Sequence, residues 1–329
     1  MRTMMAAALV VVVIAAGAGG VWYLAANGGT RDEVAIGLLP QESAALIYIA
    51  QDRGYFSENG LNVTVRNAPS GAAAVRGMET GRTELSVTGE FPIVAEALDG
   101  RNVSIVGCID RHRTVVLVGR NESGTATVAD LAGKRVGVPA GSQSQFILGR
   151  FLDLHGLGVA NVTMVDVPVS QAGDALANGS VEACVVMASD IDRVREQAGG
   201  SVVAWSFQEN QPIYQVVAGR SDWIAAHPGT VERLLRSLAR AEDFAVRYPD
   251  EATAIVGRRL SLTDAYRARV GPQNQFGLSL DRSMLTAMTD EARWMVANRL
   301  TNATTVPELR PSISTTGLEM VRPGAVTIL

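Results

Sequence analysis

Lysine, histidine and cysteine are scarce in this chain, and each shortage excludes a kind of chemistry. The only lysine among the 329 residues is Lys134, so arginine carries nearly all of the positive charge. The two cysteines, Cys108 and Cys184, lie in separate apolar runs, which favours two buried free thiols and leaves a disulfide as the alternative. The three histidines have no metal-ligand spacing, which argues against a histidine-based metal site: His112, His155 and His227.

The chain also lacks the short motifs of common catalytic sites. No glycine-rich phosphate loop, nucleophile elbow or Cys-x-x-Cys pair occurs in the sequence. The formal net charge of −4 and the absence of a basic patch argue against a nucleic-acid partner. We therefore predict that the protein is not an enzyme and that it needs neither a cofactor nor a metal.

An uncharged apolar segment near the N-terminus indicates export. The 23 residues from Met4 to Ala26 carry no charge, and Arg2 precedes them. As a helix they would cross the roughly 30 Å hydrocarbon core of a bilayer, and the arginine favours a cytoplasmic N-terminus. The run exceeds the roughly 7–15 apolar residues of a cleaved signal peptide, so we expect an uncleaved anchor, with cleavage as the alternative. The rest of the chain is then predicted on the outer face of the cytoplasmic membrane, or in the periplasm after cleavage.

Beyond this segment the sequence repeats a unit of strand, polar helix start and helix. In the first unit Gly54 ends the helix and a new strand begins near Leu61. The repeats predict an α/β lobe whose strands lie at 34–39, 61–66, 84–88 and 103–109. A β-branched run at 114–119 then crosses into a second α/β lobe, and residues 213–218 return to the first. After Ser221 the spacing predicts helices only.

We therefore expect three parts in the chain. Residues 1–30 form the signal-anchor and a spacer, residues 113–215 form the second lobe, and residues 31–112 and 216–329 together form the first lobe with the C-terminal helices. Two crossing segments between two lobes make a hinge, and a hinge permits closure around a ligand.

Several blocks of the sequence resemble one family of exported binding proteins. The blocks are QDRGYFSENGLNVTV, PSGAAAVRGMETGRTELSVTGEFP, VADLAGKRVGVPAGSQSQFIL, SQAGDALANGSVEACVVM and VRPGAVTIL. In this order they resemble the solute-binding proteins of ABC importers for nitrate, aliphatic sulfonates, taurine or thiamine-precursor pyrimidines. The resemblance covers about residue 34 to the end. It implies a type II periplasmic-binding-protein fold in a monomer, a small-molecule ligand between the lobes, and an ABC permease and its ATPase as partners.

Two features depart from the pattern of this family. Gly89-Glu90-Phe91-Pro92 stands where many members have Gly-Asp, a small residue and Pro. The lipobox cysteine is absent, so the N-terminal helix would supply the membrane tether. Similar pyridoxal-phosphate enzymes that synthesise pyrimidines need a Schiff-base lysine and a cysteine-rich iron motif, whereas Lys134 begins a strand and no cysteine cluster exists. A ligand sensor for a signalling partner remains a further alternative to import.

Candidate ligand-binding residues follow from the geometry of a parallel sheet. The carboxyl ends of its strands and the N-termini of the next helices share one edge, where free N–H groups can hold a ligand. In the first lobe this edge carries Gln41, Ser43, Ser70, Glu90, Phe91, Asp110 and Arg111. In the second lobe it carries Ser142, Gln143, Ser144 and Asp190. We predict that the two edges face each other around the ligand.

The serines among these candidates suit an anion, but they also suit a simpler role. Hydroxyls and free N–H groups at Ser142 and Ser144, beside the positive end of a helix dipole, would hold a sulfonate, carboxylate or nitrate. The same serines, and Ser70, can instead cap their own helices. Asp190 can likewise be a cap, and Phe91 can either cover a ligand or pack beside it.

The acids among the candidates suit a cation. A carboxylate in a semi-enclosed site needs a positive partner, so Glu90 would pair with a ligand ammonium or amidine or with Arg111, unless it faces water. Asp110 and Arg111 can pair with each other, or one of them can meet the ligand. An anion at Ser142 and a cation at Glu90 or Asp110 would together indicate a zwitterion such as taurine.

Overall fold

The computed structural model describes residues 31–199, 201–208, 211–263 and 273–328. The apolar N-terminal segment predicted to anchor the chain lies outside these residues. No helix within the described ranges is long and apolar enough to span a membrane.

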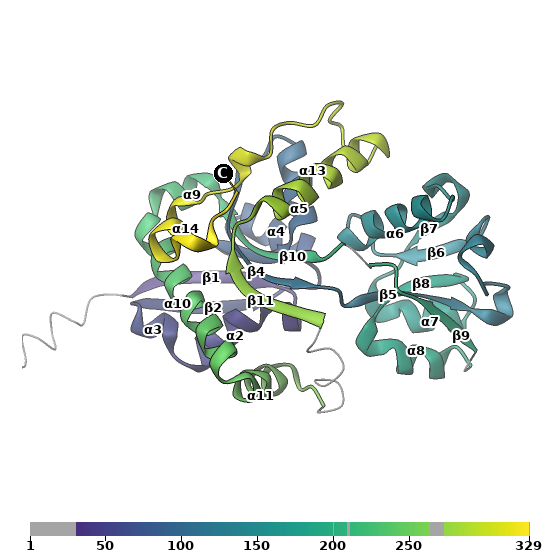
Figure 1. Cartoon of the computed structure of the whole chain (residues 1–329), viewed down its shortest axis with the longest axis horizontal. Coiled ribbons are helices and arrows are strands. Elements are labelled where there is room, and N and C mark those ends of the chain that lie inside the picture. The colour runs from purple at the N-terminus through teal and green to yellow at the C-terminus, as the bar shows by residue number, and fades with distance from the viewer. Residues whose placement is uncertain (1–30, 200, 209–210, 264–272, 329) are drawn as a thin grey trace, which may run out of the picture.

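Six strands form the first sheet, which is mixed (Figure 1). They are β1 (Asp32–Leu38), β2 (Leu61–Asn67), β3 (Leu85–Gly89), β4 (Val103–His112), β10 (Ile213–Arg220) and β11 (Asn274–Ser279). Their order is β11-β4-β10-β3-β1-β2, in which β1 pairs in parallel with β2 and β3. Strand β10 lies between β3 and β4 and is antiparallel to both. This sheet and the helices that cover it are called the first lobe.

Five strands form the second sheet, which with its helices is called the second lobe. They are β5 (Val115–Arg120), β6 (Arg135–Val138), β7 (Thr163–Asp166), β8 (Ala183–Met187) and β9 (Val202–Trp205), in the order β7-β6-β8-β5-β9. Strand β6 is parallel to β7 and β8, whereas β5 is antiparallel to β8 and β9. The chain passes between the two sheets twice, from β4 to β5 and from β9 to β10 (Figure 1).

Helices cover both faces of each sheet (Figure 1). In the first lobe they are α2 (Ala45–Asp52), α3 (Tyr55–Glu58), α4 (Gly71–Glu79), α5 (Glu90–Leu98), α9 (Ser221–Ala226), α10 (Pro228–Arg247), α11 (Pro249–Leu260), α13 (Arg282–Ala297) and α14 (Thr316–Val321). In the second lobe they are α6 (Gln143–Leu154), α7 (Ala172–Ala177) and α8 (Ile191–Gln197). Helix α2 packs on α10 and α11 over one face of the first sheet, and α5 packs on α4 and α13 over the other.

Short 3₁₀ turns complete the described elements. They are η1 (Glu42–Ala44), η2 (Asn121–Ser123), η3 (Val128–Leu131), η4 (Val159–Asn161), η5 (Val169–Gln171), η6 (Ala188–Asp190), η8 (Arg310–Ser312) and η9 (Pro323–Ala325). Of these, η1 and η6 follow strands β1 and β8, so they lie at the sheet edges where the ligand site is expected.

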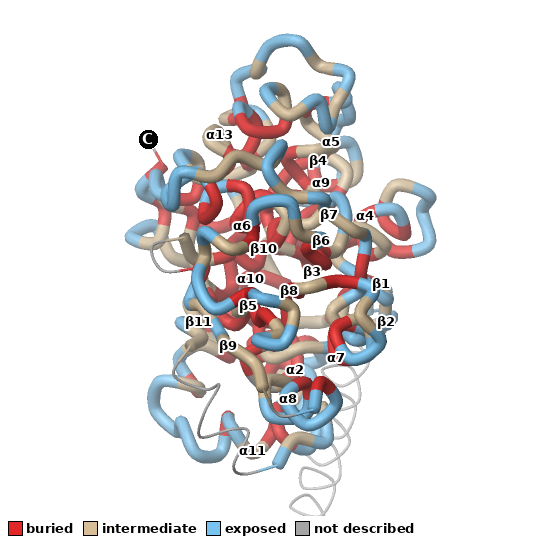
Figure 2. Tube along the Cα trace, turned by 90° about the vertical axis from the view of Figure 1, so that its right-hand side faces the viewer, coloured by how far each residue is buried: buried red, intermediate tan, exposed pale blue. Residues whose placement is uncertain are grey.

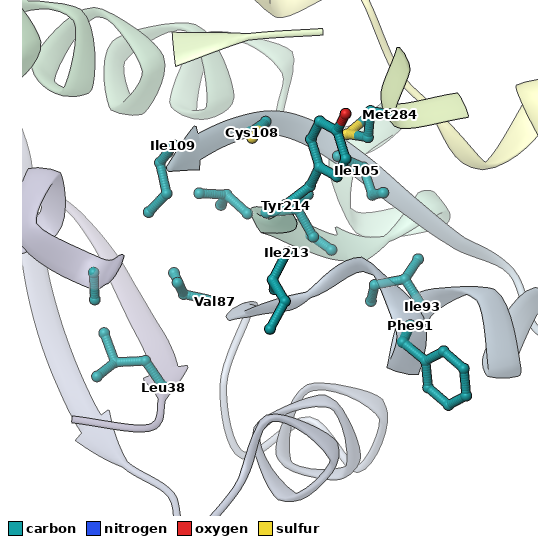
Figure 3. Close-up of a cluster of buried hydrophobic side chains, with 14 of the residues drawn as sticks. Leu38, Val87, Phe91, Ile93, Ile105, Cys108, Ile109, Ile213, Tyr214 and Met284 are labelled. Atoms are coloured by element: carbon teal, nitrogen blue, oxygen red, sulfur yellow. The ribbon is translucent and has the colours of Figure 1, made fainter. Parts of the chain in front are cut away.

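The core explains why the central strands read as continuous apolar runs. Strands β3, β4 and β10 are buried along nearly their whole length, since helices cover both of their faces (Figure 2). Figure 3 shows the centre of the first lobe, where Val87 of β3, Ile213 of β10 and Ile109 of β4 meet. Cys108 and Cys184 are both buried free thiols, as the sequence favoured.

The prediction of helices alone after Ser221 is wrong at one place. Strand β11 pairs antiparallel with β4 and forms the edge of the first sheet. Its sequence NQFGLS buries only Leu278 fully, and its pairing with β4 is irregular, so the sequence shows no alternation that would reveal a strand.

Candidate functional site

Three side chains from three helices meet between the two lobes. Glu90 begins α5 and Glu291 lies in α13, so both belong to the first lobe. Gln143 begins α6 of the second lobe. Gln143 Nε2 donates to Glu90 Oε1 at 2.6 Å and to Glu291 Oε1 at 2.9 Å. The backbone N–H of Tyr214 donates to Glu90 Oε2 at 3.0 Å. We call Glu90, Gln143 and Glu291 the carboxyl bridge.

The two acids of the carboxyl bridge are completely buried, which changes their protonation. Both Glu90 and Glu291 have 0% exposed surface. Burial raises the pKa of Glu90 to about 8, although the hydrogen bonds from Gln143 and Tyr214 oppose this change. Burial, followed by the charge of Glu90, raises the pKa of Glu291 well above its ordinary value. The pair therefore keeps a proton near neutral pH.

The lobes approach each other closely around the carboxyl bridge. A Cβ added to Gly89 would lie 2.8 Å from Gln143 Oε1, and one added to Gly149 of α6 would lie 2.5 Å from the Trp294 ring of α13. Phe146 of α6 packs between Phe91 and Trp294, with ring centroids 6.2 and 5.6 Å apart. Phe91 is 1% exposed, and its ring contact with Phe146 of the second lobe places its side chain between the lobes.

A cavity of about 310 Å³ lies beside the carboxyl bridge. Both lobes line it: Glu90, Tyr214 and Glu291 belong to the first lobe, and Gln143 and Phe146 belong to the second. Its acidic lining residues are Glu90, Asp290 and Glu291, and no arginine, lysine or histidine is among its described lining residues. Gln143 Oε1 and Glu291 Oε2 are buried without a hydrogen-bond partner among the described residues.

A second set of acids lies near η1, at the edge of the first sheet. Asp110 has 0% exposed surface, and neither of its carboxylate oxygens has a hydrogen-bond partner among the described residues. Burial raises its pKa well above the ordinary value, and the charge of Glu42 contributes. Burial also raises the pKa of Glu42, and the charge of Asp190 contributes. We call Glu42, Asp110 and Asp190 the acid edge.

Arg111 pairs with neither Asp110 nor Glu90, which excludes two of the predicted alternatives. Its guanidinium forms an ion pair with Asp281, the N-cap residue of α13, and donates to Ser279 Oγ at 3.2 Å. It also lies 5.6 Å from the centre of the Tyr214 ring. Successive residues of a strand point to opposite faces of the sheet, which explains why Asp110 and Arg111 do not pair. The alternative that Glu90 faces water is also wrong, because Glu90 is fully buried.

The expected anion-binding loop of the second lobe uses its donors within that lobe. Ser142 Oγ donates to the carbonyl of Pro139 at 2.7 Å, and the N–H of Gly141 donates to Gln145 Oε1 at 2.9 Å. Ser142 occupies the N-cap position of α6 without a side-chain cap, and Ser144 is 9% exposed. Two donors of the loop thus have partners within the second lobe, and binding of an anion by the N–H groups of Ser142 to Ser144 stays a prediction.

The remaining predicted residues have local partners. Ser70 caps α4, because its Oγ accepts the N–H of Ala73 at 3.1 Å. Gln41 Nε2 donates to Ser43 Oγ at 2.8 Å. Asp190 forms an ion pair with Arg193 at 3.0 Å. That any of these residues contacts a ligand stays a prediction.

Sequence reasoning missed Glu291. A signal for Glu291 was present in the spacing of α13, whose buried face runs through Met284, Met288, Glu291 and Met295. An acid in an apolar stripe of helical period must find a buried partner. In the described part of the chain no group of three or more His, Cys, Asp or Glu residues has a metal-binding arrangement.

The sequence profile of the NMT1/THI5-like family matches residues 41–252. The chain belongs to the NMT1/THI5-like family. The chain is 26% identical over 240 residues to a putative aliphatic sulfonates-binding protein of Bacillus subtilis, covering 69% of this chain and 71% of that one. It is 25% identical over 216 residues to the taurine-binding periplasmic protein of Escherichia coli, covering 64% and 66%. These matches confirm the resemblance that the sequence blocks indicated.

Solved structures show the same fold. The alkanesulfonate-binding protein SsuA of Xanthomonas axonopodis pv. citri, bound to MOPS, superposes with a TM-score of 0.73 at 19% identity, covering 88% of this chain and all of that one. The desulfurization enzyme DszB superposes with a TM-score of 0.66 at 18% identity, covering 89% and 99%. The chain thus has the α/β fold of periplasmic binding proteins, a fold that an enzyme also uses.

Proposed function

We propose that this NMT1/THI5-like protein is the extracytoplasmic solute-binding subunit of an ABC importer. The observation that carries the proposal is the cavity between two α/β lobes, which residues of both lobes line. The lobes are connected by two chain segments, so rotation about these segments would open and close the site. The protein would capture a solute there and deliver it to a permease that works with an ATPase.

The solute in this proposal is a small organic or inorganic anion or zwitterion of the sulfonate, taurine or nitrate type. Relatives that bind sulfonates and taurine support this class. The acidic lining of the cavity favours a zwitterion over nitrate, because an anion without a positive group would be repelled. A thiamine-precursor pyrimidine is the alternative, which the aromatic ring of Phe146 beside buried acceptors also suits.

The location follows from the N-terminal sequence and from the relatives. We propose that the apolar segment from Met4 to Ala26 is an uncleaved helix that holds the protein at the outer face of the membrane. A ligand sensor for a signalling protein would share the same fold and site. A permease and an ATPase encoded beside the gene would support import, whereas an adjacent kinase would support sensing.

Calorimetric titration of the full chain in detergent micelles tests the binding function. The ligands are taurine, alkanesulfonates, nitrate and an aminopyrimidine. We expect saturable binding of one class, and loss of cellular uptake of the same compound when the gene is deleted. Equal indifference to all four classes would remove the importer proposal for this solute range.

A further inference from the structure

We propose that the cavity beside the carboxyl bridge binds a positively charged nitrogen group of the solute, an ammonium or an amidinium. This inference rests on the proposed function, because it assigns the cavity to the transported solute. It goes further in stating which chemical group the solute must carry and which atoms hold it. Glu291 is the principal acceptor, Glu90 supplies the second negative charge, and Gln143 orients both carboxyl groups.

The charges around the cavity favour a cation. Its three acids are not balanced by a basic residue among its described lining residues. The nearest basic candidate from the sequence, Arg111, is engaged by Asp281. Arg293 pairs with Asp290 at 3.2 Å on the partly exposed side of α13, so it neutralises the outermost acid only. A cation in the cavity would therefore be attracted to Glu90 and Glu291, and an anion there would be repelled.

The hydrogen-bonding groups beside the cavity favour a ligand that donates hydrogen bonds. Gln143 Nε2 already donates to both carboxyl groups, so the free atom of its amide is the acceptor Oε1. Glu291 Oε2 is the second buried atom without a hydrogen-bond partner among the described residues, and it becomes an acceptor when the pair loses its proton. Buried polar atoms are nearly always hydrogen-bonded, and each one left without a partner destabilises the protein. A ligand group with two or more N–H donors and a positive charge would supply both missing bonds.

The volume of the cavity and its aromatic lining favour a compact cation. A volume of about 310 Å³ is at the small end of the range for small-molecule sites. Phe146 and Tyr214 contribute aromatic rings to the lining, and such rings attract cations when the site is dry. The cavity thus suits a compact amine or amidine better than a long alkyl chain.

Binding of a cation would also release a proton. The empty carboxyl bridge keeps a proton between Glu90 and Glu291, and a bound ammonium or amidinium supplies the positive charge in its place. The carboxylic acid then loses its proton to the buffer, and the ligand forms an ion pair with the resulting carboxylate. No covalent bond of the ligand changes. About one proton per ligand would be released near neutral pH.

The decisive experiment compares ligands that differ only in the cationic group. Taurine and 2-hydroxyethanesulfonate share a skeleton, and the hydroxyl replaces the ammonium; propylammonium and acetamidinium carry the cation without an anion. With the full chain in detergent micelles, calorimetry in two buffers of different ionisation enthalpy gives the affinity and the proton release together. We expect taurine to bind at least about 30-fold more tightly than 2-hydroxyethanesulfonate, with proton release in the first case only.

Two variants test the named atoms. Glu291→Gln keeps the shape of the side chain, and we expect it to weaken taurine binding at least about 30-fold and to abolish proton release. Asp153→Asn removes an exposed acid from α6, the helix of Gln143, and serves as the charge-matched control with unchanged affinity. If Glu291→Gln fails to fold, the proton release of the unaltered protein still decides the question.

The outcomes separate this inference from the importer proposal. Equal affinity for taurine and 2-hydroxyethanesulfonate without proton release would overturn the inference and leave the importer proposal standing. Failure of propylammonium and acetamidinium to bind would overturn it as well, and so would full affinity in Glu291→Gln. Two further results together would support the inference and count against the importer proposal. The first is cation binding that depends on Glu291, and the second is unchanged cellular uptake of every bound compound when the gene is deleted.

Discussion

The carboxyl bridge and the acid edge both place buried acids at the rim between the lobes, but they differ in their hydrogen-bond donors. Glu90 accepts hydrogen bonds from Gln143 and from the N–H of Tyr214. Asp110 has equally little exposed surface, and neither of its oxygens has a partner among the described residues. Burial raises the pKa at both places. Burial therefore does not distinguish the two regions, whereas a side-chain hydrogen bond from the other lobe does.

This difference affects how the lobes are held together. The carboxyl bridge joins α5 and α13 of one lobe to α6 of the other, and the rings of Phe91, Phe146 and Trp294 pack beside it. At the acid edge, the charge of Asp190 contributes to the raised pKa of Glu42, and Glu42 Oε1 has no hydrogen-bond partner among the described residues. We infer that contact is favourable on the side of the carboxyl bridge and unfavourable on the side of the acid edge. A hinge opening would then start at the acid edge.

The largest change in stability is expected from a substitution that removes the packing beside the carboxyl bridge. Phe146→Ala should lower the free energy of unfolding by about 3–5 kcal/mol, because Phe146 is 3% exposed and packs between Phe91 and Trp294. Leu154→Ala on the same helix is the control; Leu154 is 78% exposed, and the change should cost no more than about 0.5 kcal/mol. Denaturant unfolding measures both. Similar losses for the two variants would show that the lobes are not held together at this place.

The pH dependence of stability should show the protonated carboxyl bridge. The pKa of Glu90 is raised from 4.5 to about 8, so the folded protein binds a proton that the unfolded chain releases, and stability falls as the pH rises. Burial lowers the pKa of His112 from 6.5 to about 4, which has the opposite sign, but this contribution is complete above pH 6.5. Between pH 6.5 and 8 we therefore expect Glu90 alone to contribute a loss of about 2 kcal/mol, and the raised pKa values of Glu291 and Asp110 add to it with the same sign.

The charged and titratable groups around Glu90 do not reverse this sign. Glu291 and Asp290 of α13 are acids, and Tyr214 of β10 and Cys108 of β4 stay protonated because burial raises the pKa of each. Arg111 is held by Asp281. Chemical unfolding at several pH values measures the slope, and Glu90→Gln should flatten it. An unchanged slope in that variant would assign the pH dependence to other acids, such as Glu96, whose pKa is raised to about 7.

The sequence predicted most of the fold because local signals and tertiary packing agree in the parallel units. Glycines such as Gly54, Gly81 and Gly100 adopt positive φ after the helices that they end, as expected from their positions. The buried strands contain apolar runs that need no partner to be recognised. Strand β11 was missed because an edge strand with one buried residue has no such run. Its place is determined by pairing with β4, which is distant in sequence.

The candidate site was predictable only in part. Glu90 and Gln143 were recognised because each begins a helix at a sheet edge. Their common partner Glu291 is 148 residues from Gln143 and lies in a helix outside the repeated units. The sequence left open whether Asp110 pairs with its neighbour Arg111, because the predicted strand ended at residue 109. Strand β4 continues to His112, so the two side chains point to opposite faces of the sheet. The predicted anion-binding loop illustrates the same limit, since the sequence did not show that Ser142 Oγ donates to Pro139 and the N–H of Gly141 to Gln145.

Amide substitutions at the two regions should change stability in opposite directions at pH 5. Glu90 has an ordinary pKa of 4.5, so protonating it costs little at this pH, and Glu90→Gln mainly replaces an acceptor by an N–H₂ group that faces a donor. We expect a loss of about 1–3 kcal/mol. Asp110 has an ordinary pKa of 3.8 and accepts no hydrogen bond from a side chain, and an asparagine Oδ1 can keep its position beside the backbone N–H groups of Gln275 and Arg111. Asp110→Asn therefore removes the cost of protonation and should stabilise the protein by about 1 kcal/mol. Denaturant unfolding of the two variants in parallel measures both changes. A lower free energy of unfolding in both variants would mean that the carboxylate of Asp110 stabilises the fold. The two regions would then differ less than their hydrogen bonds indicate.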